Sequence, residues 1–221
     1  AQTARMGSAA WERFVYSALL LDEPDPVAAW RRLSERHARL IERLTGAGEL
    51  HVVGAGTDLR IAVAGRAWES CAGESNLPDG EVFCTPADGA VEGEITFDVP
   101  SLHNGRECRD VRLRFEAGVV VDASASFGED ALLSRLETDE GARRVGEFAI
   151  GTNEMIRRAV GDTLFDEKIG GTCHLALGRS FPALGGTNVS AIHWDLVCDL
   201  RSGGRIEADG EPVLVDGRLL V

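Results

Sequence analysis

The sequence VRLRFEAGVVV at residues 111–121 decides the fold class, because its first five residues alternate between apolar and basic side chains. A period of two is typical of a half-buried antiparallel strand. Glu116, Ala117 and Gly118 then predict a hairpin turn, and three valines follow as the return strand. Residues 94–99 (EITFDV) show the same alternation. The centre of the chain is therefore predicted to be an antiparallel sheet.

Similar patterns extend this sheet in both directions along the chain. Two short strands are predicted at residues 50–53 and 59–63, and a helix at residues 129–136. Near the end, the Asp-Gly pairs at 209–210 and 216–217 separate three apolar runs. Asp-Gly favours tight hairpin turns, so the chain is expected to finish as an antiparallel meander.

The first 45 residues show helical periodicity instead. A helix is predicted from about Ser8 to Leu21, and a second one begins after Asp25, a good N-cap, with Pro26 in its first position. We therefore expect an α+β protein in which a helical segment, residues 1–48, packs on a main domain, residues 49–221. That main domain should contain a mixed, mainly antiparallel sheet.

Composition narrows the classes of function. The net charge of −13 over 221 residues argues against a nucleic-acid or anionic-membrane partner, because such partners require a cationic surface. No apolar run approaches the roughly 20 residues that a membrane span needs. Five cysteines without a C-x-x-C spacing indicate neither a disulfide framework nor a zinc finger. Buried free thiols and a cytoplasmic location are expected.

A histidine and a carboxylate stand two residues apart at His193 and Asp195, with Trp194 between them. Residues two apart in a strand project from the same face. His193 and Asp195 can therefore reach one metal ion while Trp194 packs behind them. Taken alone, the pattern also fits an ordinary surface or core strand.

His174 lies in the glycine-bounded apolar run GGTCHLALG, residues 170–178. An unpaired buried polar group costs about 1–3 kcal/mol, so this imidazole needs a partner. A backbone carbonyl would serve as well as a metal ion. Cys173 is expected to face the opposite side of the strand, which argues against a cysteine–histidine nucleophilic pair.

Two glutamates also stand among apolar residues and glycines, where a carboxylate is hard to solvate. Glu81 follows a Pro-Asp-Gly turn in NLPDGEVF, residues 76–83, and Glu147 lies in VGEFAIG, residues 145–151. Either glutamate alone is also explained as a solvated side chain. The chain contains no P-loop, H-E-x-x-H or G-x-S-x-G motif.

Taken together, these segments resemble the M29 family of metallo-aminopeptidases, of the aminopeptidase T and aminopeptidase S type. The resemblance covers most of the chain from about residue 50, and the helical start is also similar. The matching blocks are residues 76–83 (NLPDGEVF), 91–95 (VEGEI), 139–151 (DEGARRVGEFAIG), 163–178 (TLFDEKIGGTCHLALG), 185–197 (GGTNVSAIHWDLV) and 208–211 (ADGE).

The resemblance implies a dinuclear metal site and the hydrolysis of N-terminal residues from peptides by a metal-activated water. The implied ligands are Glu81, Glu147, His174, His193 and Asp195. Oxygen and imidazole ligands suit two divalent ions of Zn, Co or Mn, with Mg as a further option. A peptide substrate and a homodimer are implied as well. The bridging ligand and the proton-transfer residue stay open.

Two departures from the family pattern leave alternatives open. Family members carry a tyrosine seven residues after the histidine that matches His174, and this chain has Phe181 there. The family enzymes are also longer, so we expect this chain to be their C-terminal, metal-bearing part, without their N-terminal domain. One alternative is a metal-binding member with lost or altered peptidase activity. Another is a non-enzymatic interaction domain with structural histidines.

Overall fold

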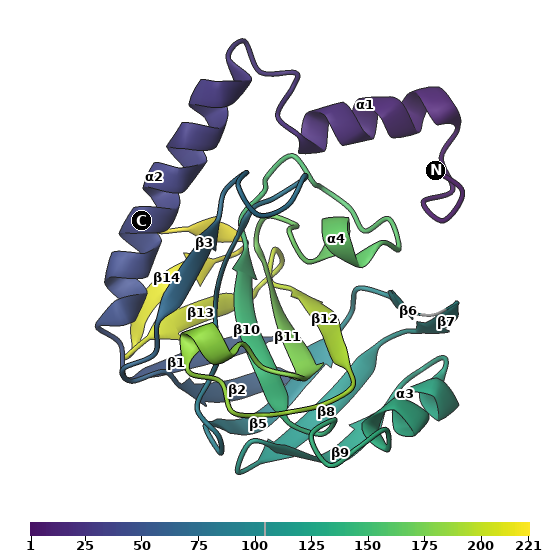
Figure 1. Cartoon of the computed structure of the whole chain (residues 1–221), viewed down its shortest axis with the longest axis vertical. Coiled ribbons are helices and arrows are strands. Elements are labelled where there is room, and N and C mark those ends of the chain that lie inside the picture. The colour runs from purple at the N-terminus through teal and green to yellow at the C-terminus, as the bar shows by residue number, and fades with distance from the viewer. Residues whose placement is uncertain (104) are drawn as a thin grey trace.

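Two antiparallel sheets lie face to face in the computed structural model, which describes residues 1–103 and 105–221 (Figure 1). The larger sheet has eight strands in the order β15-β14-β13-β1-β2-β5-β8-β9. Its strands are β1 (Glu49–Gly54), β2 (Thr57–Ala62), β5 (Val91–Phe97), β8 (Val111–Glu116), β9 (Val119–Ser124), β13 (Arg205–Ala208), β14 (Glu211–Val215) and β15 (Arg218–Leu219). All of its pairings are antiparallel, as the alternating sequences predict.

The smaller sheet has five strands in the order β12-β11-β10-β4-β3, and these pairings are antiparallel too. Its strands are β3 (Trp68–Cys71), β4 (Glu81–Cys84), β10 (Val145–Gly151), β11 (Thr172–Gly178) and β12 (His193–Asp199). A separate two-stranded ribbon joins β6 (Ser101–His103) to β7 (Arg106–Cys108). The expected α+β class with a mainly antiparallel sheet is confirmed.

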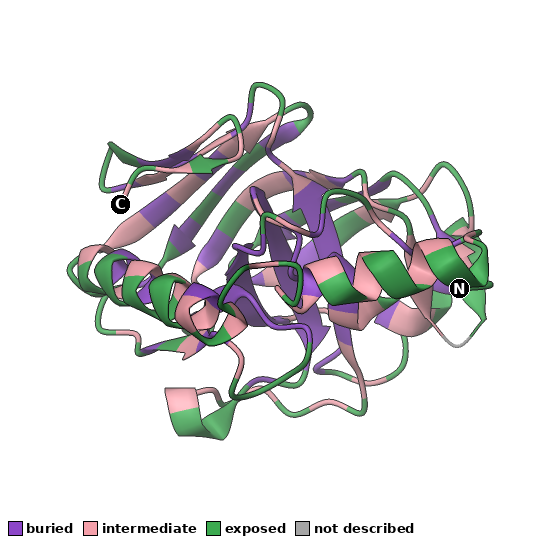
Figure 2. Cartoon of the chain, turned by 90° about the horizontal axis from the view of Figure 1, so that it is seen from above, coloured by how far each residue is buried: buried purple, intermediate pink, exposed green. Residues whose placement is uncertain are grey.

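The hydrophobic core lies between the two sheets. Side chains from the inner face of the smaller sheet, such as Phe148 and Leu175, form one buried cluster with Ile61, Ile95 and Phe115 of the larger sheet. Figure 2 shows burial concentrated on the strands, whereas the helices expose their outer sides. One face of the smaller sheet thus packs into the core, and the side chains on the opposite face do not contribute to that core.

The two predicted N-terminal helices are present. Helix α2 (Pro26–Thr45) begins as predicted, because the side chain of Asp25 accepts a hydrogen bond from the Ala28 N–H at 2.9 Å. Helix α1 (Ser8–Ala18) ends earlier than expected, since Leu20 takes a φ of 59° that no helix continues. The described helices, α2 with its 20 residues included, lack the apolar length that a membrane span requires.

The described part of the chain has three shorter helices, α3 (Glu129–Leu136), α4 (Thr163–Asp166) and the 3₁₀ helix η1 (Pro182–Leu184). Helix α1 packs on α4, because the rings of Trp11 and Phe14 each lie 5.4 Å from the ring of Phe165. This contact fixes the segment between β10 and β11 over the end of the smaller sheet (Figure 1). The division of the chain at residues 48 and 49 stays a prediction.

Candidate metal centre

The residues expected to bind metal come from four neighbouring strands of the smaller sheet. Glu81 opens β4, Glu147 lies in β10, His174 in β11, and His193 and Asp195 in β12. Their neighbours Phe148, Leu175 and Trp194 point into the core between the sheets. Because side chains alternate along a strand, the five polar residues gather on the outer face.

A β-bulge at Gly146 places Glu147 on that face. Val145 pairs with Leu177, but Glu147 pairs with Ala176, so two steps on β10 match one step on β11. Without the extra residue, Glu147 would share the core face of Val145, because residues two apart point the same way. The bulge therefore turns the carboxylate out of the core and into the candidate site.

Glu147 stands at the centre of the cluster. One of its oxygens lies 3.4 Å from Nε2 of His174, and the other lies 3.2 Å from Nε2 of His193. Nε2 of His174 is also 3.4 Å from Glu81, and Nε2 of His193 is 3.6 Å from Asp195. The structure thus brings all five sequence-predicted residues into one connected group.

On at least one neighbouring strand, a glycine or an alanine lies opposite each of these five side chains. Glu81 pairs with Gly151, and His193 pairs with Gly178. His174 pairs with Ala149, while Ala176 pairs with both Glu147 and Asp195. Since glycine and alanine have little or no side chain, the polar groups converge over open backbone.

The protonation of the cluster follows from its burial and its close charges. Burial opposes protonation of the two imidazoles, but the facing carboxylates raise the pKa of His174 and of His193 to about 9. Burial also opposes ionisation of Glu147, yet both histidines hold its pKa below the usual range. Burial raises the pKa of Glu81 and of Asp195. The buried carboxylates require nearby positive charge, from protons or from cations.

The donor atoms fit divalent cations. Nδ1 of His193 donates to the carbonyl of Arg179 at 2.7 Å, which directs Nε2 toward the carboxylates, as in metal-binding histidines. Oε2 of Glu81 is buried and accepts no hydrogen bond from the described residues. Three overlapping groups have ligand atoms within 4.8 Å of one another. They are Glu81, Glu147 and His174; Glu147, His193 and Asp195; and Glu167, His174 and Asp195.

Two further residues of this candidate centre, Glu167 and Lys168, were not among those predicted from the sequence. Both follow α4 and reach the cluster from the segment above the sheet. Nζ of Lys168 lies 2.6 Å from Oε1 of Glu81 and 2.5 Å from Oε1 of Glu167. The composition could have drawn attention to Lys168, because it is the only lysine in a chain whose other Lys and Arg positions are all arginines.

Thiolates do not contribute to the cluster. All five cysteines are buried and free, as expected from their spacing. Cys71 pairs with Glu81 across β3 and β4, and burial raises the pKa of its thiol to about 12. The donor set is therefore made of carboxylate oxygens and imidazole nitrogens, which suits Zn, Co or Mn.

Phe181 stands beside the cluster, at the position where a tyrosine was expected. Its ring lies 5.3 Å from the imidazole of His193 and 5.2 Å from the ring of Phe83. The aromatic ring is thus in place, but it carries no hydroxyl that could donate a hydrogen bond or bind a cation.

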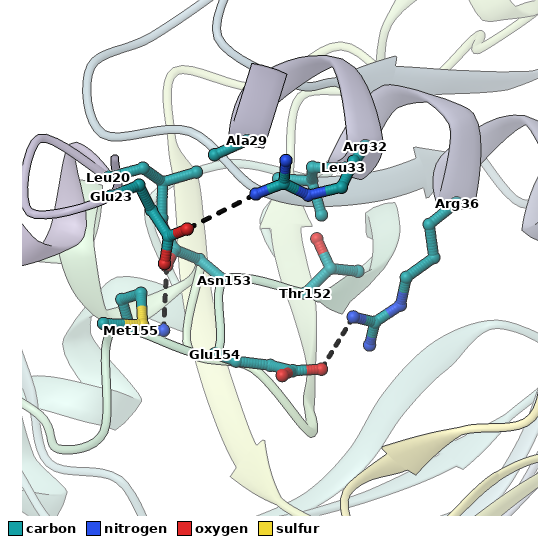
Figure 3. A pocket seen from close by; sticks show the side chains of 10 residues that line it. All are labelled: Leu20, Glu23, Ala29, Arg32, Leu33, Arg36, Thr152, Asn153, Glu154 and Met155. Carbon is teal, nitrogen blue, oxygen red and sulfur yellow. Dashed lines mark hydrogen bonds and ion pairs between the residues drawn. The ribbon is translucent and has the colours of Figure 1, made fainter. Parts of the chain in front are cut away.

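A hollow of about 220 Å³ lies elsewhere, between α2 and the residues that follow β10 (Figure 3). Its two arginines are already paired, Arg32 with Glu23 at 3.3 Å and Arg36 with Glu154 at 2.6 Å. Among the described residues that line it there is no histidine or cysteine. This hollow therefore lacks the combination of imidazoles and carboxylates that marks the candidate metal centre.

Known proteins resemble the chain along almost its whole length. It is 34% identical to aminopeptidase T of Thermus aquaticus over 92% of this chain and 55% of that protein. It is 32% identical to aminopeptidase 2 of Geobacillus stearothermophilus over 94% of this chain and 57% of that protein. The chain thus spans slightly more than half the length of these relatives.

Solved structures resemble it as well. Wild-type AmpT from Thermus thermophilus superposes with a TM-score of 0.77 at 31% identity, over 89% of this chain and 56% of that one. A 2,5-dihydroxypyridine dioxygenase from Pseudomonas putida shares the fold at 18% identity, with a TM-score of 0.68 over 85% of this chain and 60% of that one. The fold alone therefore does not decide the reaction. The family model described as thermophilic metalloprotease (M29) matches residues 1–218, and the chain belongs to this M29 family.

Proposed function

We propose that this chain carries the metal centre of an aminopeptidase that hydrolyses N-terminal residues from peptides. The observation that carries the proposal is the convergence of two imidazoles and several buried carboxylates on one face of the smaller sheet. Relatives named as aminopeptidases support the reaction type. The relatives are longer than this chain, so the activity of the whole protein is part of the proposal.

Two divalent cations would be held by the five residues that the sequence indicated. Glu147 places one oxygen near each of the two histidines, so it would contribute ligand oxygens to both sites. Glu81 and His174 would complete one site, and His193 and Asp195 the other. Zn, Co or Mn suits these donors, with Mg as a further option.

The chemistry that such a pair supplies is polarisation of the scissile carbonyl and acidification of a water molecule. The residues of the chain would position the ligand atoms around these cations. Because Nδ1 of His193 donates to the carbonyl of Arg179, Nε2 is the nitrogen that faces the cluster and would bind a cation after losing its proton. The near-complete burial of Glu81, Glu147 and His174 excludes bulk water from one side of the site. A low local dielectric strengthens each electrostatic contact there.

A second candidate function is a metal-binding member with weak or altered hydrolysis. The observation that favours it is the phenyl ring of Phe181 beside His193, where the family pattern has a phenol. The third sequence-based alternative, a non-enzymatic interaction domain, predicts no stoichiometric metal. Elemental analysis of protein purified without chelator separates it from the other two. A homodimer and a cytoplasmic location remain predictions.

The test compares two histidines that both contact two carboxylates. His193 lies in the cluster, whereas His51 contacts Asp58 at 2.7 Å and Glu207 at 3.6 Å on the larger sheet. With zinc, cobalt or manganese present, turnover of aminoacyl anilides and dipeptides should be lost in His193→Gln and kept in His51→Gln. Equal turnover by His193→Gln and the unmodified protein would refute the assignment.

A further inference from the structure

Lys168 is the one lysine among the 23 lysine and arginine residues of the chain. Its side chain is 1% exposed, although lysine is a residue type that is almost never fully buried without a partner. The partners are two carboxylates of the metal centre, Glu81 at 2.6 Å and Glu167 at 2.5 Å. The single lysine side chain of this arginine-rich chain therefore lies between two carboxylates of the metal centre.

We propose that Lys168 is a positioning residue of the metal centre. It occupies Oε1 of Glu81 and thereby leaves Oε2 as the single oxygen that this glutamate offers to a cation. The inference rests on the metal centre of the proposed function. It adds a residue that orients a ligand and specifies how that ligand binds.

The two oxygens of Glu81 have different surroundings. Oε1 accepts a hydrogen bond from Nζ of Lys168. Oε2 is buried, receives no hydrogen bond from the described residues, and lies 3.4 Å from Nε2 of His174. A carboxylate with one oxygen held and the other free is set in advance for monodentate binding. Ligands are commonly oriented in this way by outer hydrogen-bond partners.

The backbone of Lys168 is tied to the strand that carries Glu81. The Lys168 carbonyl accepts a hydrogen bond from the Asn153 N–H at 3.0 Å. The side-chain amide of Asn153 in turn donates to the carbonyls of Asp79 and Ala18, both at 2.9 Å. Asp79 stands two residues before Glu81. The ammonium is therefore placed by a network that also fixes its target.

Electrostatics alone predicts the opposite effect on metal affinity. An ammonium close to a cation site repels the cation, so removing it should strengthen binding. If Lys168 positions Glu81, its removal should weaken metal binding, because the Glu81 carboxylate would be free to rotate and would repel Glu167. The direction of the change in affinity therefore decides between the two effects.

The experiment measures zinc affinity of the full chain by competition with a chromophoric chelator. Lys168→Met keeps an unbranched side chain as far as Cε and removes the ammonium. The control Arg205→Met removes one charge from a pair on the larger sheet, where Arg205 lies 2.7 Å from Glu207. We expect about a 10–100-fold loss of affinity in Lys168→Met and none in the control. Unchanged or tighter binding by Lys168→Met overturns the inference and leaves the proposed function standing. Absence of zinc binding by the unmodified protein overturns both.

A second measurement needs no variant that removes the charge. Because the chain has one lysine, labelling with ¹³Cε,¹⁵Nζ-lysine gives a single side-chain signal. If the ammonium stays on Glu81, zinc should shift this signal while its protons remain protected from exchange with water. A signal that moves to the position and the exchange rate of a solvated lysine would show that zinc displaces the ammonium, and would refute the inference.

Discussion

The ring of Phe181 meets the imidazole of His193 at an interplanar angle of 74°, with 5.3 Å between the ring centroids. The same ring packs on Phe83 of β4 at 5.2 Å. Position 181 thus contacts two of the strands that carry the candidate metal centre, through an aromatic side chain that cannot donate a hydrogen bond. The contact is retained in a tyrosine, which adds only a hydroxyl.

Phe181→Tyr should therefore increase the hydrolysis of aminoacyl anilides. Loss of one oxyanion donor costs about 10²–10³ in turnover in a well-characterised protease, so a gain of up to that size is expected. The measurement is kcat with saturating zinc, and Phe127→Tyr, at an exposed position outside the cluster, is the control. An unchanged kcat in Phe181→Tyr would mean that the hydroxyl is dispensable in this chain.

Much of the fold could be predicted, because its signals are local. The alternation in VRLRFEAGVVV predicted β8, β9 and their hairpin, in which Ala117 and Gly118 take φ values of 49° and 71°. The two Asp-Gly turns of the terminal meander also form as expected, and α3 spans the predicted residues. The packing of the two sheets has no such signal, since it depends on residues far apart in sequence.

The site was harder to predict from residue spacing. His193 and Asp195 share a face because they stand two apart, which a sequence shows. Glu147 reaches that face through a bulge, which shifts the alternation by one residue and leaves no periodic trace. Lys168 arrives from a segment between two strands, so only its rarity in the composition could have marked it.

Gly146→Ala should disturb both histidine and glutamate ligands. A Cβ at this bulge would lie 2.4 Å from the carbonyl oxygen of Arg179, the group that orients His193. The backbone at Gly146 or at Arg179 would have to shift, because the new Cβ and the carbonyl oxygen are both fixed to the backbone. We expect about a 10–100-fold loss of zinc affinity, the range for altered outer contacts of a ligand.

The matched control for this substitution is Gly46→Ala. A Cβ there meets no atom of the described residues within 4 Å, and Gly46 has a φ of −83° that alanine also adopts. Chelator competition should give the same zinc affinity for Gly46→Ala and the unmodified chain. Wild-type affinity in Gly146→Ala would show that the bulge tolerates a side chain and that the Arg179 carbonyl is not needed to orient His193.

Because of His37, the free energy of unfolding should decrease as the pH falls below 6.5. Its imidazole is buried between the hydroxyls of Ser70 and Thr152, at 2.8 and 2.7 Å, and burial, aided by the charge of Arg36, lowers its pKa from 6.5 to about 4. Between these two values the unfolded chain binds a proton that the folded chain does not. Stability is therefore lost from pH 6.5 downward and the loss levels off below about pH 4, with a total of about 3 kcal/mol.

Urea unfolding at several pH values between 7 and 4 measures this effect in the unmodified protein and in His37→Gln. Carboxylates elsewhere titrate in both proteins, so their contribution cancels in the difference. The free energy of unfolding should fall less steeply with decreasing pH in His37→Gln. Parallel curves for the two proteins would contradict a neutral, buried His37.

His174 and Leu175 are neighbours in β11 whose substitution should have separate consequences. Leu175 is fully buried between the sheets, so Leu175→Ala should lower the free energy of unfolding by about 2–5 kcal/mol. Because its side chain points away from the cluster, the stabilisation by zinc should stay as in the unmodified protein. That increment is about 2.7 kcal/mol when zinc is present at 100 times its dissociation constant.

His174→Gln should show the reverse pattern in the same urea titrations. The imidazole faces Glu81 and Glu147, and its replacement removes a ligand atom, so zinc should add little stability at that concentration. The comparison is between the increases in unfolding free energy that zinc causes in the two variants. The unfolding free energies without zinc are not compared, because removing His174 also takes a hydrogen-bond partner from the buried carboxylates. If zinc stabilised His174→Gln as much as Leu175→Ala, the outer face of the smaller sheet would not be the side that binds the metal.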